Sequence, residues 1–109
     1  MINFRIERLP LDGGALQVWG QTNPLHSNWP VVYTINDKKQ IYVGETTTPV
    51  NRLLQHLSNP KRSKMEHAQI IFNETFNKSV CMDLESFLIQ YFAADERYQV
   101  LNLNKGLTN

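Results

Sequence analysis

The pattern of apolar and polar positions predicts strands on both sides of a central hairpin. Residues 2–9 alternate with a period of two, which predicts a half-buried strand ended by Pro10. Residues 67–72 are predicted to form another strand. Residues 11–28, which contain glycines and a proline, predict a short helix or an irregular stretch, and residues 98–109 alternate only weakly.

The hairpin is the clearest predicted element. Residues 31–35 and 40–44 are rich in β-branched and aromatic side chains and flank the polar turn 36–39. If this turn is symmetric, Tyr33 lies directly opposite Tyr42. Both phenols then share one face of the sheet.

A first amphipathic helix is predicted after the hairpin. Thr48 and Pro49 provide an N-cap and a first-turn proline, and Pro60 ends the helix. The apolar positions that keep the helical spacing are Val50, Leu53, Leu54 and Leu57. Arg52 and His56 lie one turn apart on the opposite, polar side.

A second amphipathic helix is predicted over residues 79–95. The side chains expected to be buried are Leu84, Phe87, Leu88 and Tyr91, and those expected to face solvent are Asp83, Ser86 and Gln90. Glu85 falls among apolar neighbours instead. A buried carboxylate needs a cation, a hydrogen-bond network or a metal. The alternative is that Glu85 lies near the first turn and tips toward solvent at the core's edge.

Composition limits the classes of function. The 109 residues, 41% of them hydrophobic, suit one globular domain. A net charge of +1 excludes a uniformly basic surface, so contact with nucleic acid needs a local patch. No apolar run approaches the roughly 20 residues that span a bilayer, so no membrane contact is expected. The single Cys81 cannot form an internal disulfide, which indicates the reducing cytoplasm.

Taken singly, the candidate residues have ordinary interpretations. Tyr33 and Tyr42 suit cross-strand packing, and Arg52 and His56 suit a solvated helix face. Cys81 is expected to pack as a small apolar residue. The other histidines lie far from any metal-ligand spacing, and the chain has no phosphate-binding glycine-rich loop.

Taken together, these residues resemble the GIY-YIG nuclease family. The motifs are Val31-Val32-Tyr33, Tyr42-Val43-Gly44, Arg52 with His56, and Glu85-Ser86-Phe87-Leu88-Ile89. The resemblance covers about residues 30–104, after an N-terminal extension, residues 1–29. It implies one α+β domain, residues 1–109, with a small central antiparallel sheet of about three strands flanked by helices, to which an N-terminal strand can be added.

Segments 28–30, 42–47 and 76–80 resemble more closely the N-terminal GIY-YIG module of bacterial schlafen-related DNA/RNA helicase-like proteins. In those proteins an ATPase domain follows. The expectation is therefore that the chain is excised from a longer protein or is a shortened relative.

The resemblance implies a metal-dependent endonuclease that hydrolyses DNA, with RNA or branched DNA as other substrates. Glu85 would be the ligand of Mg²⁺ or Mn²⁺, and Tyr42 the general base for the attacking water. Tyr33 would bind water or phosphate and is the reserve base. Arg52 would clamp the scissile phosphate, and His56 would orient Tyr42 or share its proton.

Further residues are implied around this site. The supporting positions are Gly44 and an asparagine near the end, for which both Asn102 and Asn104 qualify. Residues 51–67 carry the basic residues Arg52, Lys61, Arg62 and Lys64 against one acidic residue, which predicts a local nucleic-acid contact.

One departure favours a different class of function. Many relatives have lysine directly after the motif glycine, where this chain has Glu45. The alternative is a weak or inactive nucleic-acid-binding or regulatory module for an attached helicase. A third hypothesis, a protein-interaction domain, predicts no salt-dependent affinity for DNA.

Overall fold

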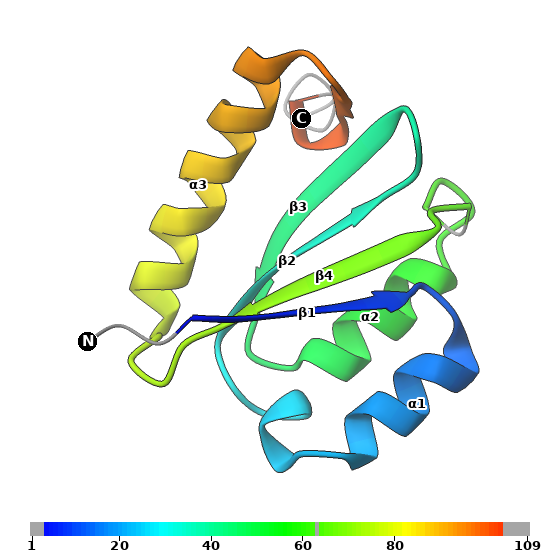
Figure 1. Cartoon of the computed structure of the whole chain (residues 1–109), viewed down its shortest axis with the longest axis vertical. Helices are drawn as coiled ribbons and strands as arrows, with labels where there is room; N and C mark the ends of the chain where they lie inside the picture. Colours follow the sequence, from blue (N-terminus) through cyan, green and yellow to red (C-terminus); the bar gives the residue numbers. More distant parts are fainter. Residues whose placement is uncertain (1–3, 63, 104–109) are drawn as a thin grey trace.

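The computed structural model describes residues 4–62 and 64–103, which form an α+β fold around one sheet. The strands are β1 (Arg5–Pro10), β2 (Val31–Asn36), β3 (Gln40–Thr46), β4 (His67–Phe72) and β5 (Gln99–Val100). The helices are α1 (Gly13–Gln21), α2 (Pro49–Leu57) and α3 (Lys78–Asp95), with a 3₁₀ turn, η1 (Pro24–His26). Helices α1 and α2 lie on one side of the sheet and α3 on the other (Figure 1).

The sheet has the order β1-β4-β2-β3-β5. The α+β class and the helix-flanked central sheet are confirmed, and the sheet is larger than the sequence suggested. The N-terminal strand β1 pairs with β4, and the short β5 pairs with β3 in parallel, so the sheet is mixed. Pro10 lies inside β1 rather than after it, which an edge strand tolerates because one side needs no hydrogen bond.

The hairpin register differs from the predicted one. Tyr33 pairs with Gly44 rather than with Tyr42, so the register is shifted by two residues. The Asp37 carboxylate accepts the backbone N–H groups of Lys39 and Gln40, which centres the turn one residue later than expected. Because side chains alternate with a period of two, this shift leaves both tyrosines on one face, as predicted.

Helix α2 buries a wider face than its apolar stripe indicated. His56 is only 3% exposed and lies with Leu53 toward the sheet, so its predicted place on the polar side is wrong. The face of the sheet that is turned toward α2 carries the two tyrosines. The Tyr33 hydroxyl there gives the buried imidazole of His56 a hydrogen-bond partner. Arg52 is half-buried, not a fully solvated side chain.

Helix α3 buries fewer side chains than predicted. Phe87 and Tyr91 are 62% and 54% exposed, because α3 contacts β2, β3 and β5 along a narrow stripe of its surface. Cys81 is fully buried on this stripe, as expected, and Leu84 and Leu88 are partly buried against the same cluster.

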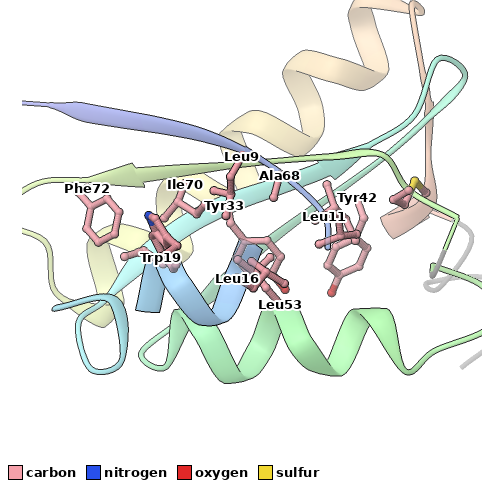
Figure 2. Packing of buried hydrophobic residues seen from close by; sticks show 13 residues of the cluster. Leu9, Leu11, Leu16, Trp19, Tyr33, Tyr42, Leu53, Ala68, Ile70 and Phe72 are labelled. Carbon is pink, nitrogen blue, oxygen red and sulfur yellow. The ribbon is translucent and has the colours of Figure 1, made fainter. Parts of the chain in front are cut away.

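Two apolar clusters stabilise the sheet from its two faces. The larger lies under α1 and α2, where Figure 2 shows Leu16, Leu53 and the two motif tyrosines between the sheet and the helices. The smaller joins Val32 and Val43 to α3. No helix among the described residues is long and apolar enough to cross a membrane.

Candidate functional site

Tyr33 is the centre of a hydrogen-bonded group between the sheet and α2. Its ring, in the middle of β2, is 1% exposed. The Arg52 Nε–H group donates to the Tyr33 hydroxyl oxygen over 3.2 Å, and the same hydroxyl lies 2.7 Å from His56 Nε2. Arg52 and His56 reach this one atom because residues four apart lie on the same side of a helix.

The environment sets the protonation of this group. Burial raises the pKa of Tyr33 well above its ordinary value, and the neighbouring charges of Tyr42 and Glu85 act in the same direction. Burial lowers the pKa of His56 to about 4, with the guanidinium groups of Arg52 and Arg62 contributing. At neutral pH this short contact therefore joins a protonated Tyr33 hydroxyl to a neutral His56 imidazole.

Tyr42 lies beside this group without a hydrogen bond to His56. Its ring centroid is 6.3 Å from that of Tyr33 and 5.0 Å from the His56 imidazole. Burial opposes the charged form of Arg52, but contacts with the phenols of Tyr33 and Tyr42 raise its pKa above the ordinary value. Arg52 therefore links both tyrosines as a permanent cation.

Gly44 lets Tyr33 occupy its position. Gly44 is the cross-strand partner of Tyr33, and a Cβ built on it would overlap with Cζ and the hydroxyl oxygen of the tyrosine. A side chain at this position would displace a fully buried ring. The glycine is therefore required by the packing of the site.

Glu85 approaches the same group from α3. Its side chain is half-buried, and its negative charge is close enough to raise the pKa of Tyr33. Asp83, Ser86 and Gln90 are exposed, as predicted from the helical wheel. The charge of Glu85 thus acts on Tyr33 of β2, although Glu85 belongs to a helix on the other side of the sheet.

Asn102 fixes the open edge of β3. Its Oδ1 accepts the Val43 N–H over 2.9 Å, and its Nδ2 donates to the Val43 carbonyl over 2.7 Å. The amide therefore continues the pairing that β5 begins two residues earlier. Of the two asparagines considered from the sequence, Asn104 lies outside the described residues, and Asn102 has this defined contact.

The basic segment lies next to the tyrosines. Arg62 places its guanidinium over the Tyr42 ring, with Cζ 4.3 Å from the ring centroid, and Lys61 and Lys64 are exposed in the same loop. Glu45 forms an ion pair with Lys78 at the start of α3 over 3.2 Å. The charge of Glu45 is therefore partly compensated.

The remaining histidines do not join the site. His26 is buried against Trp19, with 3.8 Å between the ring centroids, and its Nδ1 lies 2.6 Å from the Trp19 carbonyl oxygen. His67 is exposed on β4.

The donor set suits a hydrated hard cation. Among residues 4–62 and 64–103, no group of three or more histidine, cysteine or acidic side chains could enclose a metal. Mg²⁺ prefers oxygen and is commonly bound through one or two carboxylates while it keeps several waters. The half-buried carboxylate of Glu85 fits such an ion better than a fully enclosed one.

Comparison with known proteins places these residues within one family profile. The profile of the GIY-YIG catalytic domain matches residues 30–99, which include both tyrosines, Arg52, His56 and Glu85. No curated protein and no solved structure matches the chain. Because the match spans well over half of the sequence, the chain belongs to the GIY-YIG family, whose members are generally nucleases.

Proposed function

We propose that this domain is a divalent-metal-dependent endonuclease that hydrolyses phosphodiester bonds in DNA. The observation that carries the proposal is the convergence of Tyr33, Arg52 and His56 on one hydroxyl group, with Tyr42 and Glu85 beside it. Four separate elements of the fold, β2, β3, α2 and α3, supply these residues, and the family match gives the class of reaction.

Arg52 is the phosphate clamp in this proposal. Its guanidinium remains charged, is half-buried and uses its Nε on Tyr33, so its terminal nitrogens are oriented by a fixed partner. A positioned cation of this kind offsets the negative charge that develops on a phosphodiester during attack.

Tyr42 is the proposed general base. Tyr33 is unsuited to this role because its raised pKa keeps the phenol protonated near neutral pH, and its hydroxyl is already bonded to Arg52 and His56. Tyr33 instead holds Arg52 in place, and the neutral His56 fixes Tyr33 by accepting its hydrogen. Tyr42, acting as its phenolate, would then take the proton of the attacking water, and the positive charge of Arg52 would stabilise that phenolate.

Glu85 would hold the Mg²⁺ or Mn²⁺ ion, which would act as a Lewis acid toward the phosphate and the leaving oxygen. Lys61, Arg62 and Lys64 would bind the DNA backbone near the clamp, and Gly44 and Asn102 would support the site. The free, buried Cys81 favours a cytoplasmic location. The resemblance to schlafen-related proteins suggests a helicase or ATPase domain as a partner in a longer protein.

The test is cleavage of supercoiled plasmid with Mg²⁺ or Mn²⁺. Arg52→Met and Glu85→Gln should each reduce the rate by about 100-fold or more, the usual cost of removing one stabilising group from a transition state. Arg8→Met and Asp83→Asn are matched controls, because both residues are exposed and Asp83 is on the same helix as Glu85. Equal cleavage by all five proteins would contradict the assigned site, and no cleavage by wild type with either metal would contradict the activity.

A second candidate function is a nucleic-acid-binding module without catalysis. The commitment of the Tyr33 hydroxyl to two protein partners and the negative charge of Glu45 favour it. Titration with Mn²⁺ separates the two: an enzyme shows a metal site that is lost in Glu85→Gln, whereas a binding module holds DNA without one.

A further inference from the structure

The side chain of Arg62 lies on the proposed general base. Its guanidinium carbon is 4.3 Å from the centroid of the Tyr42 ring, within the range of a cation–π contact. Its Nε atom is buried and has no hydrogen-bond acceptor among the described residues, so the ring face is the group it meets. An arginine that only contacts DNA has no need of this placement.

The backbone of the loop, rather than this contact, determines where Arg62 lies. The Arg62 N–H donates to the Asn59 carbonyl, and the Arg62 carbonyl accepts from Met65, which is 4% exposed. The next residue, Glu66, bonds through its N–H to the Asn36 carbonyl of β2. The loop is therefore anchored on both sides of Arg62, and the fold presents this side chain to Tyr42.

Two different groups thus lie against the Tyr42 ring. The His56 imidazole lies 5.0 Å from its ring centroid and the Arg62 guanidinium 4.3 Å from it. The ring is 5% exposed, so a contact with its face strongly restricts its rotation. Lys61 and Lys64, on the same loop, are exposed and make no such contact among the described residues.

We propose that Arg62 is a positioning residue of the nuclease site, which holds the Tyr42 ring in the orientation that presents its hydroxyl to the attacking water. This inference rests on the proposed function, because it gives Arg62 a part in the chemical step in addition to its proposed contact with DNA. The cation on the ring face does two things: it restricts the ring, and it adds a second positive charge beside that of Arg52.

The first experiment separates rate from affinity. Single-turnover cleavage with saturating DNA is measured for wild type, Arg62→Met and Arg62→Lys, with the dissociation constant for DNA measured separately. Arg62→Met should lower the saturated rate by about tenfold, the range of a desolvated cation–π contact, beyond any change in affinity. Arg62→Lys should be intermediate, because an ammonium group can still lie over the ring.

Arg8→Met is the matched control. Arg8 is exposed on β1, and because Leu9 is buried under the helices, the alternation of the strand places Arg8 on the opposite face of the sheet from Tyr42. Like Arg62→Met, the Arg8→Met substitution replaces a charged arginine by methionine. The Arg8→Met protein should retain the wild-type rate. A saturated rate for Arg62→Met equal to that of wild type, or one for Arg62→Lys no faster than Arg62→Met, would overturn the proposal.

The second experiment does not require activity. The chain is labelled with ¹³C-tyrosine, and the Tyr42 signal is assigned by its loss in Tyr42→Phe. Arg62→Met should shift the Tyr42 signal and speed its ring flips, while Tyr91 and Tyr98 stay unchanged. A chemical-shift change at Tyr42 no larger than those at Tyr91 and Tyr98 would overturn the positioning role. Failure of wild type to cleave would count against the nuclease proposal alone, since the NMR result stands by itself.

Discussion

Acidification should remove stability that depends on the neutral His56 ring. The pKa of this buried imidazole is about 4, whereas its ordinary value is 6.5. The unfolded chain therefore takes up a proton near pH 6.5 while the folded protein stays neutral to about pH 4, so the unfolded state binds more protons in this interval. The contribution is fully present above pH 6.5 and is lost as the pH falls toward 4.

The magnitude follows from the same two values. A tenfold change in a protonation equilibrium is worth about 1.4 kcal/mol, so the stability tied to His56 falls by about 2.5 kcal/mol between pH 7 and pH 4.5. Urea unfolding, followed by the fluorescence of Trp19 and Trp29, gives the free energy of unfolding at both pH values.

The comparison with His56→Gln isolates this effect. A glutamine amide can bond to the Tyr33 hydroxyl but does not titrate, so its free energy of unfolding should fall by about 2.5 kcal/mol less than that of wild type. His67→Gln, which removes an exposed histidine, is the control and should follow wild type. Parallel losses in wild type and His56→Gln would refute the reasoning, because the acid sensitivity would then arise elsewhere.

Three further predictions concern the strands around the site. Gly44→Ala should lower the free energy of unfolding by about 1–3 kcal/mol in urea, because its Cβ overlaps with the buried Tyr33 ring; unchanged stability would contradict the packing. Asn102→Asp should lower the free energy of unfolding by about 1–3 kcal/mol at pH 7, because a carboxylate oxygen replaces the amide group that donates to the Val43 carbonyl of β3. This loss of stability should become smaller in acid, where the carboxyl group is protonated and can donate again. Glu45→Gln should raise DNA affinity about twofold by fluorescence anisotropy at low salt, with the difference shrinking at high salt; equal affinities would place Glu45 away from the DNA path.

Several elements could be predicted because their signals are local. Strand β4 and helix α2 follow from the distribution of apolar residues and from the proline that starts the helix. The anomaly of Glu85 on an apolar helix face also came from the helical wheel alone, and the structure places its charge beside Tyr33. Neither case needed knowledge of a distant partner.

Other features depended on contacts that sequence spacing does not contain. The turn is centred one residue later than predicted, because the Asp37 carboxylate accepts hydrogen bonds from two backbone N–H groups. Nothing in the polar sequence of residues 36–39 indicates that Asp37 would form these bonds. Phe87 was expected to be buried and is exposed, since α3 covers only part of the sheet. The contact of Arg62 with Tyr42 was also missed, and its only signal was the position of the basic segment.

The sequence by itself determined the residue types, their order and which of them share one side of a strand or helix, because alternation in strands and helical spacing are local properties. Tertiary structure decided which of these faces meet. It made His56 a neutral, buried partner of Tyr33, brought the charge of Glu85 to that phenol, and used Asn102 to close the β3 edge. Burial and long-range approach set protonation and hydrogen bonding here, and both arise only when distant segments pack together.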